Sequence, residues 1–90
     1  MIYHTSLTAE EEDRVRRIYE IAGQQIYPTY EQWERRFMEV DDLQTELWMW
    51  EVIADAYPRA QAEHPELTPL AIIAILTVGV GERFEAEGII

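Results

Sequence analysis

The segment TPLAIIAILTVGVGER, from Thr68 to Arg83, contains eleven consecutive residues with almost no polarity, Leu70 to Val80. Thr68 is a favourable N-cap, and Pro69 suits the first position of a helix because its missing N–H would have no partner there. Gly88 suits the position just beyond a helix C-terminus. These signals predict a helix over about residues 69–87. Because the helix is apolar on all sides for three turns, we expect it to be centrally buried.

Three other assignments compete for this segment. A membrane span needs about 20 apolar residues to cross roughly 30 Å of hydrocarbon. Eleven residues in a helix rise only about 16 Å, so a membrane span is not expected. The sequence Gly79-Val80-Gly81 resembles the start of a dinucleotide-binding turn, but Phe84 occupies the position of the third glycine. Six of the eleven residues are β-branched, so a strand over part of residues 70–80 stays open as the less favoured alternative.

Three further helices are predicted from caps and apolar periodicity, over about residues 8–26, 30–40 and 42–57. Thr8 with Glu11 forms a capping-box pattern, and Thr29 starts the second helix. Asp42 can cap the third helix, which Pro58 is expected to end. The chain is therefore predicted to be all-α, a small bundle of about four helices in a single acidic domain over residues 1–90.

The first helix carries an acidic run followed by three arginines, at a spacing that favours salt bridges along its surface. Residues four apart lie next to each other on a helix, and such ion pairs contribute a few tenths of a kcal/mol. The expected pairs are Glu10 with Arg14, Glu12 with Arg16, and Asp13 with Arg17. This acidic run is therefore interpreted as an ordinary solvated face rather than a binding site.

The charge of the chain is strongly negative, with 18 acids, seven basic residues and a formal net charge of −11. Most of the excess lies in residues 37–66, where eight acids accompany one arginine. Binding a nucleic acid backbone directly requires a basic surface, so we do not expect it here. The N-terminus has no basic segment followed by an apolar run, so the expected location is cytoplasmic.

The residues that usually carry catalysis are scarce. The chain has no cysteine, no lysine, one serine and two isolated histidines, His4 and His64. No metal-ligand spacing and no distinct pair of carboxylates for acid and base roles is apparent. We therefore expect no catalytic residue, no metal site and no cofactor, and the chain is predicted not to be an enzyme.

The third helix carries more apolar surface than one core can cover. Trp48 and Trp50 lie about 200° apart on it, so they cannot face the same core. We expect the surplus to be buried in a homodimer, in which the contact residues are Trp48, Met49, Val52, Ala71, Ala74 and Gly79. The alternative is that Trp48 is covered by Ile2 and Tyr3 or by Ile89 and Ile90.

These features favour a non-catalytic protein–protein interaction or assembly module that self-associates through apolar helix faces next to an acidic surface. The acidic residues expected on that surface are Glu39, Asp41, Asp42, Glu46, Glu51 and Asp55. The alternative is a mimic of nucleic-acid charge, of the kind made by phages or mobile elements, which would bind a basic groove of a partner enzyme. Affinity for such a basic partner would fall steeply with salt, whereas an apolar helix contact would persist.

Overall fold

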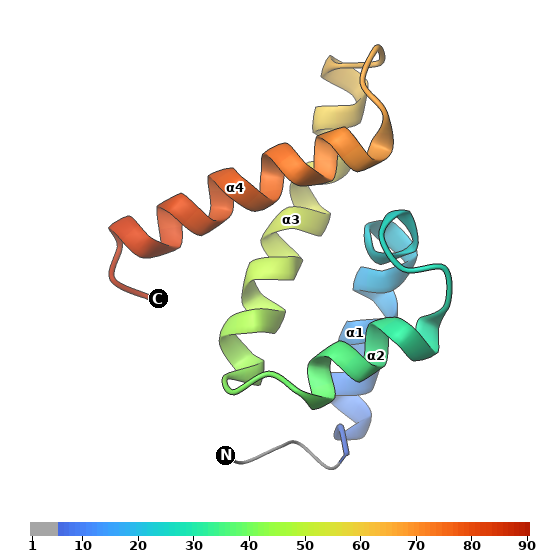
Figure 1. Cartoon of the computed structure of the whole chain (residues 1–90), viewed down its shortest axis with the longest axis vertical. Coiled ribbons are helices and arrows are strands. Elements are labelled where there is room, and N and C mark those ends of the chain that lie inside the picture. Colours follow the sequence, from blue (N-terminus) through green and yellow to red (C-terminus); the bar gives the residue numbers. More distant parts are fainter. Residues whose placement is uncertain (1–5) are drawn as a thin grey trace.

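The computed structural model describes residues 6–90 and shows four α-helices and one short 3-10 helix (Figure 1). In chain order they are α1 (Ala9–Ile21), the 3-10 helix η1 (Gly23–Gln25), α2 (Tyr30–Met38), α3 (Leu43–Glu63) and α4 (Pro69–Ala86). No strand occurs among the described residues. The all-α prediction is therefore confirmed, and the strand alternative for residues 70–80 is wrong.

The predicted helix starts are confirmed by their side-chain caps. The Thr8 hydroxyl accepts a hydrogen bond from the Glu11 N–H, and the Glu11 carboxylate accepts one from the Thr8 N–H. Thr29, Asp42 and Thr68 cap α2, α3 and α4, each by accepting a backbone N–H hydrogen bond with its side-chain oxygen. Such caps satisfy N–H groups that have no partner within the helix.

The C-terminal end of α4 is also built as its sequence predicts. Gly88 has a positive φ of 76°, which glycine adopts without the steric penalty of a side chain. The Gly88 N–H donates to the Glu85 carbonyl, and the Ile89 N–H donates to the Phe84 carbonyl. These two bonds form a Schellman motif that closes the helix.

The third helix does not end at Pro58 as expected, but continues to Glu63. Proline removes one N–H, and so one helical hydrogen bond, at its own position. The residues after it, Ala60 to Glu63, are good helix formers, and Tyr57 and Ala60 pack into or against the core. Packing therefore outweighs the local penalty. The other predicted ends were too long, since α1 ends at Ile21 and α2 at Met38.

The core is centred on Trp33, which is fully buried between α1, α2 and α3. Its ring makes edge contacts with Phe37 at 5.1 Å and with Trp50 at 5.0 Å between centroids. Its indole Nε1 donates a hydrogen bond of 3.1 Å to the Val15 carbonyl oxygen. A buried indole N–H needs such a partner, so Trp33 holds α2 against α1 both by apolar packing and by this hydrogen bond.

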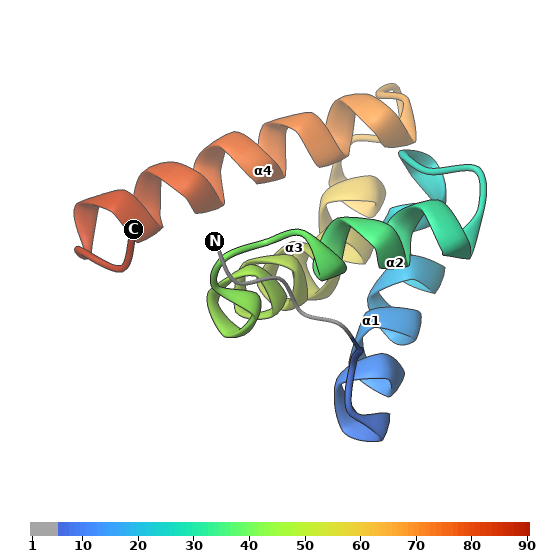
Figure 2. The same cartoon turned by 60° about the horizontal axis from the view of Figure 1, so that its bottom comes forward.

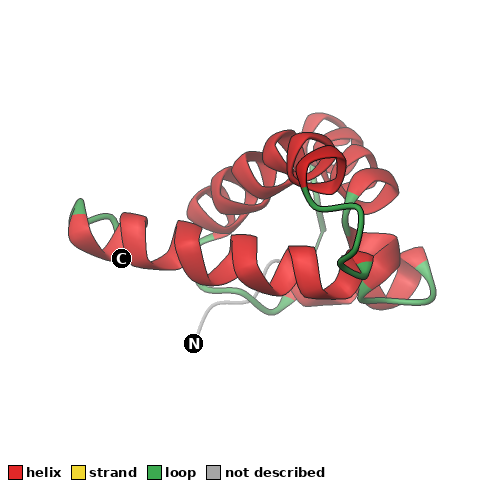
Figure 3. Ribbon diagram, turned by 90° about the horizontal axis from the view of Figure 1, so that it is seen from above, coloured by secondary structure: helices red, strands yellow, loops and turns green. Residues whose placement is uncertain are grey.

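The fourth helix is not centrally buried, contrary to the prediction. It packs chiefly against α3 and runs along the outside of the molecule (Figures 1 and 2). Within α4 the buried side chains are Ile72, Ile73, Val80 and Phe84. A single neighbouring helix covers only one face, so Leu70, Ile75 and Val78 remain 56%, 60% and 61% exposed. The view in Figure 3 shows this one-sided arrangement of α4.

Candidate functional site

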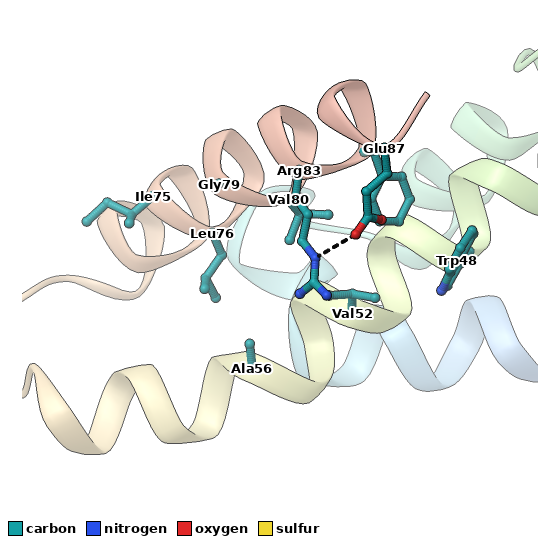
Figure 4. Close-up of a pocket in the computed structure, with 10 residues that line it drawn as sticks. Trp48, Val52, Ala56, Ile75, Leu76, Gly79, Val80, Arg83 and Glu87 are labelled. Carbon is teal, nitrogen blue, oxygen red and sulfur yellow. Dashed lines mark hydrogen bonds and ion pairs between the residues drawn. The ribbon is translucent and has the colours of Figure 1, made fainter. Parts of the chain in front are cut away.

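An apolar groove of about 530 Å³ lies between α3 and α4 (Figure 4). One wall comes from α3 and the other from α4. The lining residues are Trp48, Val52 and Ala56 from α3, and Ile75, Leu76, Gly79, Val80, Arg83, Phe84 and Glu87 from α4. Positions 48, 52 and 56 are spaced at four residues, which places them along one side of α3. We call this feature the α3–α4 groove.

Trp48 stands at the rim of the α3–α4 groove. Its ring lies 4.9 Å from that of Phe84 between centroids, at an interplanar angle of 47°. Phe84 is buried, whereas Trp48 is 48% exposed and Trp50 is buried. The prediction that the two tryptophans face different sides of α3 is therefore confirmed, and residues 6–90, including Ile89 and Ile90, leave Trp48 half uncovered. Ile2 and Tyr3, the other expected cover, lie outside the described residues.

The α3–α4 groove carries almost no charge of its own. Within the described chain, the charged side chains that line it are Arg83 and Glu87. They form an ion pair, with 3.5 Å between the Arg83 Nε and Glu87 Oε1 atoms (Figure 4). An occupant of the groove would therefore meet carbon rather than unpaired charge.

A second, smaller hollow of about 110 Å³ adjoins the groove nearer to the loop between α3 and α4. It shares Ile75 and Leu76 with the larger groove and adds Ala60, His64, Leu67 and Ile72. The two hollows follow the same line between the two helices. The apolar surface therefore extends along much of the contact between α3 and α4, and Ile75 belongs to both parts.

The predicted contact residues separate into three groups in the structure. Trp48, Val52 and Gly79 line the α3–α4 groove together. Met49 instead packs against the core. Ala71, which is half-buried, and Ala74, which is exposed, lie on α4 outside the groove. Whether any of them touches a partner stays a prediction.

Sequence reasoning missed the other groove residues, which are Ala56, Ile75, Leu76, Val80, Arg83, Phe84 and Glu87. The four-residue step from Trp48 through Val52 could have indicated Ala56. Ile75 could not be recognised as exposed, because the helix was expected to be covered on all sides.

Neither glycine within α4 is needed by the packing of the described residues. A Cβ atom added to Gly79 or to Gly81 would meet nothing within 4 Å. Neither residue has a positive φ. Glycine inside a helix costs about 1 kcal/mol relative to alanine, so this helix contains two unfavourable residues for which contacts within the described chain give no reason.

The predicted acidic residues are not equivalent. Glu46 forms an ion pair with Arg36 and accepts a hydrogen bond from the Trp50 indole. Asp42 caps α3. Glu39, Asp41 and Asp55 are exposed. The acidic surface is therefore partly used to hold α2 and α3 in place.

The salt bridges of α1 differ from the predicted ones, because two of its arginines pair with Glu51 on α3. Glu12 pairs with Arg16 as expected, at 3.4 Å. Arg14 and Arg17 instead reach across to Glu51 on α3, at 2.7 and 3.9 Å. The hydrogen bond with Glu51 raises the pKa of Arg14. A half-buried carboxylate on a neighbouring helix thus takes the place of the local partners Glu10 and Asp13, and its ion pairs join α1 to α3.

Residues 6–90 lack the features that would indicate a metal site or a membrane span. These residues contain no group of three or more histidine, aspartate or glutamate side chains placed to hold a metal ion. None of the helices in the same range is long and apolar enough to span a bilayer.

Comparison of the chain with protein-family models, with curated proteins and with solved structures finds no match. Any functional proposal therefore depends on the geometry described above.

Proposed function

We propose that this protein is a non-catalytic assembly module that associates with a second copy of itself through the α3–α4 groove and the exposed side of α4. One observation carries the proposal: α4 is apolar on nearly all sides over its first three turns, yet only its α3-facing side is buried. A helix of this composition is normally surrounded by other apolar surface. Exposed apolar patches of this kind mark interaction sites.

The exposed side chains on this surface can supply a useful but modest driving force. Full burial of a large apolar side chain contributes about 1.5–3 kcal/mol. Trp48, Leu70, Ile75 and Val78 are each about half exposed, so covering all four would contribute about 4 kcal/mol per copy. Two copies would gain about 8 kcal/mol, which is comparable to the roughly 4–15 kcal/mol lost on association. At most about 4 kcal/mol would remain after this cost, so we expect a weak dimer with a dissociation constant of about millimolar.

Charge favours a second copy as the occupant over a basic partner. Each chain carries −11, but the groove contributes only the mutually paired Arg83 and Glu87. Two such surfaces can meet without burying unpaired charge. Repulsion between the remaining surfaces of the two copies is long-range and is screened by salt. Self-association should therefore strengthen as salt rises.

The alternative, a charge mimic with a basic partner, gives the opposite salt dependence. Such a complex would be weakened by salt because its attraction comes from the acidic surface. The contacts of Glu46 and Glu51 with Arg36 and Arg14 reduce the charge that this surface can offer. The observations therefore give more support to the self-association proposal.

Sedimentation equilibrium at about 20 mM and about 500 mM NaCl tests the proposal, because screening differs strongly between these conditions. We expect a monomer–dimer equilibrium that shifts toward dimer at high salt. Ile75→Glu should abolish the dimer by burying a charge. Gln24→Glu, at an exposed site in η1, adds the same charge elsewhere and should leave the dimer unchanged. A monomer at all concentrations, or a dimer insensitive to Ile75→Glu, would contradict the proposal.

A further inference from the structure

Four residues on the exposed side of α4 have a spacing along the sequence that is the same from either end of the helix. At about 100° per residue, Ala71, Ile75, Val78 and Glu82 lie within an arc of about 60°. Successive members are four, three and four residues apart. Ile75, Val78 and Glu82 are exposed and Ala71 is half-buried. We call these four residues the α4 stripe.

Resting on the proposed self-association, we infer that two copies pair through their α4 stripes in antiparallel orientation. The symmetric spacing places Ile75 of one copy opposite Val78 of the other, and Ala71 opposite Glu82. Each contact occurs twice about the two-fold axis, as an isologous interface requires. The axis passes between positions 76 and 77 of each helix.

The distribution of charge along α4 decides between antiparallel and parallel pairing. The first three turns carry no charged residue, whereas Glu82, Glu85 and Glu87 lie at the C-terminal end with Arg83. Arg83 is already paired with Glu87. Parallel pairing would bring Glu82 against its own copy. Antiparallel pairing instead places it beside the N-terminal turn of the partner helix, where the helix dipole favours negative charge.

The shape of the surface next to the stripe allows a second helix to approach. Ile75 belongs both to the stripe and to the α3–α4 groove. Gly79, in the groove wall, has open space where a Cβ would lie. A helix lying on the stripe would therefore border the groove at Ile75.

Cysteine cross-linking can test the orientation, because the chain contains no cysteine. Ala71→Cys and Glu82→Cys proteins would be mixed under mild oxidation and compared with each variant alone. We expect several-fold more disulfide-linked dimer in the mixture. In the antiparallel arrangement the two copies of position 71 are separated by about 16 Å along the helix axis, as are the two copies of position 82.

The same experiment separates this inference from the proposed function. Ile75→Cys mixed with Val78→Cys should also cross-link, and Gln24→Cys, far along the chain in η1, should not. Parallel pairing would give the reverse result, with Ala71→Cys and Glu82→Cys each linking to itself. That pattern, or a dimer in sedimentation with no cross-link at the stripe, would overturn the antiparallel inference while self-association stands. A chain that is always monomeric would overturn both.

Discussion

The Trp48 and Phe84 rings lie 4.9 Å apart between centroids, yet Phe84 is buried and Trp48 is half exposed. Trp48 therefore closes one side of the contact between α3 and α4 while its other face remains available. The same side chain has a structural role within the chain and, in the proposed dimer, a role between chains.

Substitutions of these two residues should separate the two roles. Phe84→Ala should destabilise the fold by about 3–5 kcal/mol because it leaves a cavity in the buried contact. Trp48→Ala should cost only about 1–2 kcal/mol because half of its ring is already in water. Urea denaturation monitored by circular dichroism measures both values. A larger loss for Trp48→Ala than for Phe84→Ala would contradict this description of the contact.

Replacing glycine with alanine should change the stability of the fold in opposite directions at Gly23 and at the two glycines of α4. A Cβ at Gly23 would lie 3.0 Å from the Tyr19 ring and 3.1 Å from the Trp33 ring, so Gly23→Ala should destabilise the fold by about 1–3 kcal/mol. Gly79→Ala and Gly81→Ala have open space and should each stabilise α4 by up to about 1 kcal/mol. Melting temperatures of the three variants provide the comparison. Equal signs at Gly23 and Gly79 would show that the described packing is incorrect.

Two acidic residues should differ in their contribution to stability. Glu46→Ala removes the partner of the half-buried Arg36 and of the Trp50 indole, and we expect a loss of about 1–3 kcal/mol. Asp55→Ala is the matched control, since Asp55 is exposed on the same helix, and its effect should stay within about 0.5 kcal/mol. Chemical denaturation of both variants tests this difference. Similar values would mean that the Arg36 contact contributes little in solution.

Tyr30 should make stability fall in alkaline solution. Burial, the largest cause, and the negative charge of Glu34 together raise the pKa of Tyr30 to about 12, against the opposing charge of Arg16. The folded chain therefore keeps this proton at a pH where the unfolded chain, with a pKa near 10, has lost it. Stability is unaffected below about pH 10 and declines as the pH rises toward about 12.

The expected loss from Tyr30 is about 1–2 kcal/mol, because the side chain is only partly buried. Urea unfolding at about pH 9 and about pH 11.5 brackets the titration. Tyr30→Phe removes the ionisable group and should reduce the difference between the two conditions. An unchanged pH dependence in Tyr30→Phe would assign the effect to other groups.

Local signals made the helix starts predictable from the sequence. The caps at Thr8, Thr29, Asp42 and Thr68 depend on hydrogen bonds between residues three apart, so they need no knowledge of the tertiary fold. The same holds for Gly88, whose conformation is set by the turn it occupies. The continuation of α3 through Pro58 could not be predicted in this way, because packing beyond the proline decides it.

The candidate site was predicted only in part, for a related physical reason. Trp48, Val52 and Gly79 were expected at a contact and do line one groove. An apolar surface shows that a helix requires cover, but not which element supplies it. The position of α4 at the edge of the molecule, and so the exposure of Ile75 and Val78, depends on how the helices pack together.

The one-sided packing of α4 also affects the order in which the protein opens. Regions with few buried contacts exchange their amide protons through local fluctuations well before the whole molecule unfolds. We expect α4 to open locally in this way, because it packs chiefly against one helix, α3. It also contains Gly79 and Gly81, which lower the stability of the helix. Dimer formation would then rigidify α4, and the entropy lost in ordering it would offset part of the free energy of association.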